Sequence, residues 1–278
     1  MSLEKRDTLS RMALWTHHVV QHRSPVTGVE LMTISSNHQF PRHAHDQFGI
    51  GVIQRGVQRS WSGIGQVEAV AGDVIMVNPG EIHDGIPIAR RIREWRMIYF
   101  DPKRLAKELE GETTCCFEVA RPVAQDQLLA RHFEPLFEAL IDLNVDHLAR
   151  EENLLESLMY ALRQYGAHRS SDRQKPCVAR ALKRIDRAPE MPVSLSELAA
   201  LSDLSRFQLL RAFTAAVGIT PHAYVIQRRA RLAKRFLAKG FSPAHAAAQS
   251  GFADQSHMTR AVVRQFGITP RRYQAAVI

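Results

Sequence analysis

The four residues Gly-Ile-Thr-Pro occur twice in this 278-residue chain, at 218–221 and again at 267–270. The flanking residues repeat as well. An arginine stands seven positions before each glycine and a tyrosine three positions after each proline, which gives the pairs Arg211 and Arg260, Tyr224 and Tyr273. A glycine commonly ends a helix, because the left-handed conformation required there costs glycine little. The repeat therefore predicts two copies of one arginine-bearing helical unit.

The net positive charge of the chain comes from its last hundred or so residues, which contain the repeat. Residues 175–278 contain 17 Lys and Arg against 5 Asp and Glu, whereas residues 1–174 contain 20 against 23. Such asymmetry is the electrostatic pattern of a module that meets phosphate groups. An anionic membrane surface is the alternative partner, but no basic amphipathic stretch is paired with an exposed aromatic face.

The chain lacks the sequence signs of a secreted or membrane protein. Its cysteines, Cys115, Cys116 and Cys177, are odd in number and two are adjacent, so no disulfide framework is readable. Residues 1–18 are broken by charges and have no apolar core of signal-peptide length. No apolar run is long enough to cross a bilayer. We therefore expect a soluble, cytoplasmic protein.

Residues 28–100 alternate short β-prone runs with glycine-containing turns. Strands are predicted at Glu30–Ser35, Gly49–Gln54, Gln66–Val70, Val74–Val77 and Glu94–Tyr99. Strands this short and closely spaced predict an antiparallel barrel or sandwich. From Gln125 the apolar residues recur at three- and four-residue steps, which predicts two helices reaching to about residue 165. These helices either support a homodimer or pack on their own barrel.

The polar segment 167–176, which ends in proline, is typical of a linker. We therefore divide the chain into an effector-binding and dimerisation domain at 1–166, a linker at 167–177 and a helical domain at 178–278. The predicted fold class is α+β with two domains: a β-barrel followed by helices, and an all-α domain.

The helical domain shows two helix-turn-helix units, at about 194–217 and 242–266. Their helices begin at the capping residues Ser194, Ser205, Ser242 and Asp254. A connecting helix over 221–239 is studded with basic residues. In such a unit, side chains near the start of the second helix reach base edges in the major groove of DNA. The candidates are Phe207 and Arg211 in the first unit, and Gln255, Ser256, Thr259 and Arg260 in the second. Alternatively, the arginines contact phosphates and Phe207 belongs to the core.

The second unit carries a family signature. The pattern Ala248-x-x-Gly251-Phe252-x-Asp254-x-Ser256-x-x-x-Arg260, continued by Gly267-x-Thr269-Pro270-x-x-Tyr273, resembles that of the AraC/XylS transcriptional regulators. The resemblance covers roughly residues 176–278. It implies seven helices, with two recognition helices entering adjacent major-groove segments, and it adds Arg206 and Leu210 to the DNA contacts. The chain departs from the family pattern at Leu210, at His257-Met258 and at Val262-Val263.

The barrel carries a histidine cluster. His43 and His45 would point the same way, His83 lies on a later run, and three imidazoles suit a first-row metal such as zinc or iron. The segment resembles the cupin motif pair of AraC-type sensor domains, but the glutamate that metal-binding cupins place after the histidine pair is absent, with Gly49 at that position. We therefore favour a pocket for a small organic effector over a metal cofactor, and a divalent metal on His43, His45 and His83 is the alternative. The predicted lining of the pocket is His43, His45, Trp61, Glu81, His83 and Trp95, although the two tryptophans could be ordinary packing residues.

Together these features predict a sequence-specific DNA-binding transcription regulator, not an enzyme, controlled by a small-molecule effector. Its expected partners are double-stranded DNA, the effector and a second copy in a homodimer, with RNA polymerase a further candidate and no membrane. The alternatives are a metal-dependent cupin enzyme with a helical DNA-binding appendage, and an architectural DNA-binding protein with a degenerate barrel.

Overall fold

The computed structural model describes residues 16–108, 117–168 and 176–278. The adjacent Cys115 and Cys116 and most of the charged N-terminal segment lie outside the described residues. Within the described part, no single helix is long and apolar enough to cross a membrane. Two successive helices, Arg206–Val217 and Pro221–Ala238, together reach the required length and apolar composition, but they are bent by 54° relative to each other.

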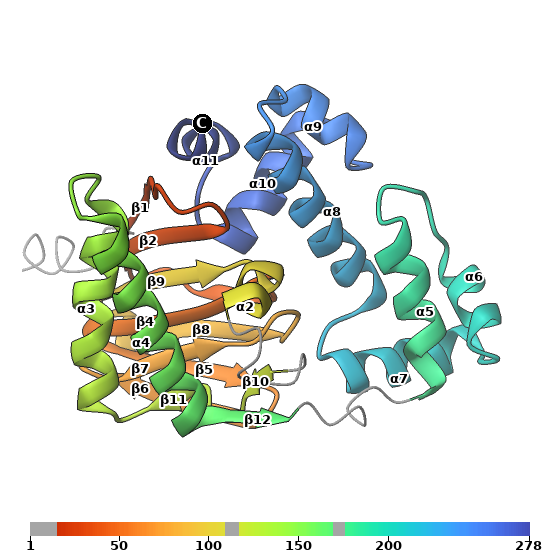
Figure 1. Ribbon diagram of the computed structural model, residues 1–278. Coiled ribbons are helices and arrows are strands. Elements are labelled where there is room, and N and C mark those ends of the chain that lie inside the picture. Colours follow the sequence, from red (N-terminus) through yellow and green to blue (C-terminus); the bar gives the residue numbers. More distant parts are fainter. Residues whose placement is uncertain (1–15, 109–116, 169–175) are drawn as a thin grey trace, which may run out of the picture.

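Two antiparallel sheets face each other in the N-terminal domain (Figure 1). The six-stranded sheet has the order β1 (His17–His22), β2 (Val29–Ser36), β9 (Arg93–Phe100), β4 (Phe48–Arg55), β7 (Val74–Val77) and β11 (Val123–Ala124). The four-stranded sheet has the order β3 (Phe40–His43), β8 (His83–Pro87), β5 (Val57–Ser62) and β6 (Gly65–Val70). All five predicted strands are present, and the predicted barrel or sandwich is confirmed. Shorter elements are η1 (Ile88–Arg90), α2 (Pro102–Glu108) and the paired strands β10 (Phe117–Val119) and β12 (Gly166–His168).

The six-stranded sheet is buried on both faces. Along β9, Trp95, Met97 and Tyr99 belong to the core between the sheets, whereas Ile98 and Phe100 belong to the core on the outer face. This alternation follows from the two-residue side-chain period of a strand. The outer face is covered by α3 (Gln127–Ile141) and α4 (His147–Tyr165), drawn in green in Figure 1.

The two covering helices pack their inner faces against the barrel of the same chain. The buried side chains of α3 include Phe133, Leu136 and Phe137, and those of α4 include Leu154 and Leu158. The outer side of this layer leaves apolar residues exposed, with Leu148 at 63% and Leu155 at 36% of their full accessible surface. The packing alternative is thus correct for the inner faces, and a homodimer stays a prediction.

The C-terminal domain has seven described helices, as the family resemblance implied. They are α5 (Pro176–Arg187), α6 (Leu195–Leu201), α7 (Arg206–Val217), α8 (Pro221–Ala238), α9 (Pro243–Gln249), α10 (Gln255–Phe266) and α11 (Pro270–Val277). The four predicted capping side chains each accept a backbone N–H of the first helical turn. Gly218 and Gly267 end α7 and α10 with φ values of 85° and 71°, in the left-handed region that favours glycine.

The predicted linker, 167–177, overlaps two described elements at its ends, and the domain bounds stay a prediction. Ala167 and His168 belong to β12, which pairs with β10, and α5 already begins at Pro176. The segment between them, 169–175, lies outside the described residues. Strand β12 has the sequence Gly-Ala-His, and a strand of three residues is too short to show an apolar alternation.

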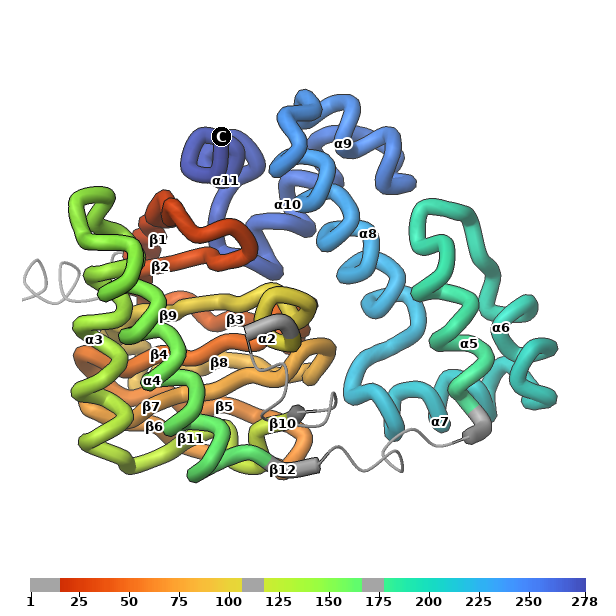
Figure 2. Tube along the Cα trace, viewed as in Figure 1, coloured from red at the N-terminus to blue at the C-terminus, as the bar shows by residue number. Residues whose placement is uncertain are grey.

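The helices of the C-terminal domain lie along one side of the barrel, away from α3 and α4 (Figure 2). The two helix-turn-helix units sit at opposite ends of α8 (Figure 1). The first unit has a core of its own, which includes Leu209 and Phe213. The second unit instead shares one buried cluster with the barrel, in which Phe266 and Ile268 join Phe40, Trp95 and Met97.

Candidate functional site

The first turns of α7 carry an exposed surface. Arg206, Phe207, Leu210 and Arg211 are all exposed, Phe207 at 67% of its full accessible surface. The Arg211 guanidinium lies 5.6 Å from the centre of the Phe207 ring, which is within cation–π range. The suggestion that Phe207 belongs to the core is therefore wrong. The helix presents a paired aromatic and cationic surface, while Leu209 and Phe213 fill the core behind it.

The first turns of α10 carry the corresponding surface of the second unit. Gln255, Ser256 and Arg260 are exposed, and Thr259 is partly buried. Two of the departures from the family pattern in this helix, Met258 and Val262, lie behind this face and are fully buried. These two are core residues, whereas His257 and Val263 are partly buried and Leu210 is exposed. All eight predicted DNA-contacting side chains thus lie on the outward turns of two recognition helices, and their roles stay predictions.

The basic residues of α8 have a different use from the one their charge suggested. Arg228 and Arg231 both donate to Oδ1 of Asp46, at 3.0 and 2.5 Å, and Lys234 Nζ donates to Glu30 Oε2 at 2.7 Å. Asp46 and Glu30 belong to the barrel. Much of the charge on α8 therefore holds the two domains together instead of facing DNA.

The two Gly-Ile-Thr-Pro turns are docking points on the barrel. Arg42 Nη1 donates to the carbonyl oxygen of Gly218 at 3.1 Å, and His17 Nε2 donates to that of Gly267 at 2.8 Å. The isoleucine that follows each glycine is buried: Ile219 packs with Ala44 and Ile82, and Ile268 enters the shared cluster. Each repeat closes a recognition helix and joins it to the sensor barrel.

A cavity of about 80 Å³ lies between the barrel and the C-terminal domain. Its barrel lining is largely apolar and aromatic, with Ile34, Phe40, Met97 and Tyr99 among the lining residues. The C-terminal domain supplies Lys234, Gln265, Phe266, Ile268 and Tyr273. Both domains therefore form the wall of a single cavity.

Four of the six predicted effector-binding residues line this cavity: His43, His45, His83 and Trp95. Trp61 and Glu81 do not, and their assignment to this pocket was wrong. They line a separate cleft between the barrel and the first helix-turn-helix unit. The Trp61 ring lies 4.0 Å beneath the Arg42 guanidinium, and the Glu81 carboxylate accepts hydrogen bonds from Gly63 N and Asn78 Nδ2. Glu81 thus supports the loops around Gly63 and Asn78, and Trp61 packs against the apolar cluster of Ala44, Ile82 and Ile219.

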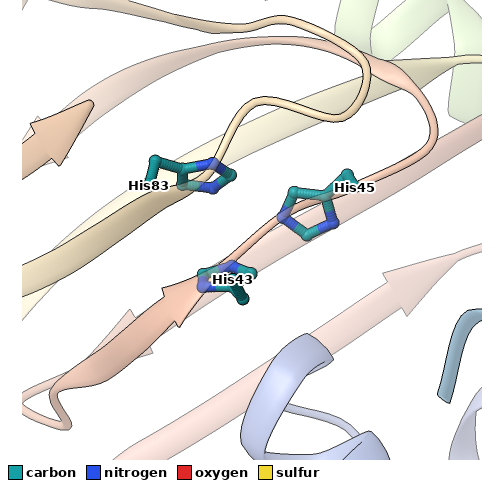
Figure 3. Close-up of side chains that lie close together, drawn as sticks. All are labelled: His43, His45 and His83. Atoms are coloured by element: carbon teal, nitrogen blue, oxygen red, sulfur yellow. The ribbon is translucent and has the colours of Figure 1, made fainter. Parts of the chain in front are cut away.

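The three histidines meet at the cavity wall (Figure 3). One nitrogen of each ring lies within 4.8 Å of the corresponding nitrogens of the other two. His43 Nδ1 donates to Pro41 O at 2.7 Å, and His83 Nδ1 donates to Glu81 O at 3.1 Å. These bonds leave Nε2 of His43 and Nε2 of His83 as the acceptor nitrogens. Within the described residues, no carboxylate completes the cluster.

Burial keeps these imidazoles neutral. It lowers the pKa of His43 to about 3, with a further contribution from His83. The pKa values of His45 and His83 are also lowered from their usual value, in both cases mainly by burial. Removal of a charged imidazolium from water is unfavourable, so the neutral form is favoured at physiological pH. Neutral imidazole nitrogen can accept a hydrogen bond or bind a metal ion.

Comparison with known proteins agrees with this architecture. Residues 31–162 match the model of the AraC-like ligand binding domain, and residues 198–276 match a helix-turn-helix domain model. The HTH-type transcriptional regulator YbfI of Bacillus subtilis is 32% identical over 227 residues, covering 79% of this chain and 82% of YbfI. The HTH-type transcriptional regulator MtrA of Neisseria gonorrhoeae is 33% identical over 93 residues, or 33% of this chain and 31% of MtrA.

Among solved structures, ToxT from Vibrio cholerae has a TM-score of 0.55 at 10% identity, covering 95% of this chain and 98% of that one. At this identity the likeness is one of fold. This chain thus contains both a ligand-binding barrel and a helical domain with two helix-turn-helix units. Its match to YbfI extends over most of both chains. The chain belongs to the AraC family of transcription regulators, with a ligand-binding domain and a helix-turn-helix DNA-binding domain.

Proposed function

We propose that a small organic effector occupies the cavity between the domains and thereby controls DNA binding. The observation that supports this most directly is the shared wall, because α8, α10 and the turn after α10 line the cavity together with the barrel. A ligand can shift an equilibrium only if it contacts one state better than the other. A molecule that touches both domains satisfies that condition, since separation of the domains would remove its contacts with the C-terminal domain.

The eight outward residues on α7 and α10 are the proposed DNA-reading surface. Arginine suits guanine, glutamine suits adenine, and apolar or aromatic side chains suit the thymine methyl group. The two sets differ in chemistry: Arg206, Phe207, Leu210 and Arg211 against Gln255, Ser256, Thr259 and Arg260. The proposed operator therefore consists of two unlike half-sites for each subunit, in adjacent segments of the major groove.

The finer assignments follow from this role. We propose a cytoplasmic homodimer formed through the exposed side of the layer made by α3 and α4, with RNA polymerase as a further partner at the promoter. We also propose that the barrel senses a ligand and does not catalyse a reaction. The regulator names of the relatives support this, and turnover of the effector by the purified protein would contradict it.

The experiment pairs ligand binding with DNA binding in the full-length protein. Small molecules are screened by thermal shift, and compounds that bind are then tested for their effect on affinity for promoter duplexes by fluorescence anisotropy. ToxT has been solved with an unsaturated fatty acid bound, so such an acid belongs in the first set of compounds.

Two variants separate the two activities. Ile34→Trp fills the cavity and should abolish the thermal shift while DNA binding persists. Arg211→Ala should do the reverse. If Ile34→Trp responds to the same ligand as the unchanged protein, the effector binds elsewhere and the proposal fails.

A further inference from the structure

The cavity wall has the features of a metal site. Three nitrogen ligands from β3, the loop after it and the start of β8 converge there, and metal-binding histidines usually donate their other ring N–H to a carbonyl or carboxylate. His43 and His83 do so, to the backbone oxygens of Pro41 and Glu81. Their remaining nitrogens therefore have free lone pairs in the tautomer that a metal requires.

His45 provides a second, independent observation. Its side chain is 7% exposed, yet within the described residues its ring makes no hydrogen bond and is held only by neighbouring rings. A buried polar group without a partner is unfavourable, and native structures usually satisfy such groups. His45 lines the cavity, so a ligand within the cavity could satisfy it.

The geometry is close to that of a bound ion. Metal–nitrogen distances of roughly 2.0–2.1 Å place tetrahedral nitrogen ligands about 3.3 Å apart. The present upper limit is 4.8 Å, and the ring centres are 4.5–5.2 Å apart. The His45 ring makes no hydrogen bond within the described residues, so it is free to rotate toward an ion bound by His43 and His83.

We propose that His43, His45 and His83 bind one divalent first-row transition-metal ion whose fourth position opens into the cavity and accepts an anionic group of the effector. Three neutral imidazoles suit such ions, and a fourth open position is the arrangement of metal sites that take an exchangeable ligand. Arg93 places a buried positive charge behind this wall. It is fully buried, it donates hydrogen bonds to Gln58 and to the Gly85 carbonyl oxygen, and its guanidinium lies 4.8 Å from the Trp95 ring centre. Gln58, Gly85 and Trp95 line the cavity, and Arg93 Nη1 has no hydrogen-bond partner.

The site lies directly under the second recognition helix. Gln265, near the end of α10, donates to the carbonyl oxygen of Ala44 at 2.8 Å, and Ala44 stands between His43 and His45. Phe266 lies 6.0 Å from the His45 ring. Movement of His45 toward an ion would therefore be felt at the base of α10. The role in effector control rests on the proposed function, whereas metal binding stands without it.

The test uses the full-length protein stripped of metal with EDTA and titrated with Co²⁺, whose visible absorption reports tetrahedral nitrogen ligation. We expect one Co²⁺ per chain, displaced by Zn²⁺, with one zinc per chain by mass spectrometry. His45→Gln should weaken Co²⁺ binding at least about tenfold, the lower range for removal of groups that support a metal. His45 is chosen because its loss breaks no hydrogen bond. His38→Gln, at a histidine outside the cluster, should bind Co²⁺ as the unchanged protein does.

Azide then probes the open position in the Co²⁺ protein. A changed visible spectrum supports the anion-accepting site, and an unchanged spectrum overturns that part of the proposal. Absence of stoichiometric metal, or equal Co²⁺ affinity in His45→Gln, overturns the metal site. Circular dichroism checks that each variant is folded. Promoter binding is measured on the same samples, so a protein that binds Co²⁺ but not DNA contradicts the proposed function and leaves the metal site standing.

Discussion

Two arginines, Arg211 on α7 and Arg260 on α10, occupy equivalent positions in the two recognition helices and are both exposed. If each reads a base, replacement with alanine should cost about 1–3 kcal/mol of binding free energy on the specific site and much less on random duplex. Arg264, which is exposed in the last turn of α10, provides the matched control. The measurement is anisotropy on both duplexes at fixed salt. An equal loss on both would identify the arginines as phosphate contacts.

At the same scale, local spacing predicts some site residues and cannot predict others. His43 and His45 are two residues apart, which places them on one side of an extended segment, and the sequence therefore identified them. Trp61 and Glu81 have the right chemistry, but their strands and loops direct them outside the cavity. Asp46 and Arg231 form an ion pair across 185 positions, and no local pattern indicates such a contact.

The helical elements offer a matched pair of glycines with left-handed backbone. Gly251, in the turn between α9 and α10, has φ 77°, and a Cβ there would lie 2.3 Å from the Glu190 carbonyl oxygen. Gly240, after α8, has φ 86°, but a Cβ there would meet nothing closer than 3.8 Å. Gly240→Ala should cost about 1–2 kcal/mol, the penalty of the left-handed conformation alone. Gly251→Ala should cost clearly more, because the backbone of the α5–α6 connection must also move.

The measurement is the urea concentration at the midpoint of unfolding for each variant. If the slope of the unfolding free energy against urea concentration is unchanged, a shift of the midpoint reports a change in stability. Similar midpoints for the two glycine variants would show that the turn of the second unit adjusts freely, contrary to the close approach to Glu190.

Elements with local start and stop signals were predictable from the sequence, and those without such signals were not. The caps Ser194, Ser205, Ser242 and Asp254 fix the starts of α6, α7, α9 and α10, and all four starts were predicted correctly. Strand β1 (His17–His22) escaped prediction because half of its residues are histidine, and β3 because proline interrupts it. These strands form through pairing with β2 and β8 rather than through a visible apolar alternation.

For the molecule as a whole, the exposed leucines of α4 predict how two copies meet. Leu148 and Leu155 are seven residues apart, which places them on one side of a helix two turns apart. Leu148→Glu combined with Leu155→Glu should convert the proposed dimer to monomer, because burial of a carboxylate in an apolar interface is costly. Size-exclusion chromatography with light scattering measures the mass. Leu143→Glu, at an exposed leucine in the α3–α4 connection, is the control. A double variant that stays dimeric places the interface elsewhere.

The docking of the two domains depends on Asp46, whose carboxylate receives both Arg228 and Arg231. The Arg231 side chain is only 6% exposed, so Asp46→Ala leaves a buried guanidinium without its carboxylate, and separation of the domains would return that charge to water. We expect a larger radius of gyration in small-angle X-ray scattering and a weaker response of DNA affinity to the effector. Glu68→Ala is the matched control, since Glu68 has the same 48% side-chain exposure but pairs with Arg59 inside the barrel. If both variants keep the dimensions and ligand response of the unchanged protein, the shared apolar cluster around Phe266 and Ile268 must hold the domains together without the ion pairs, and the effector acts on that cluster alone.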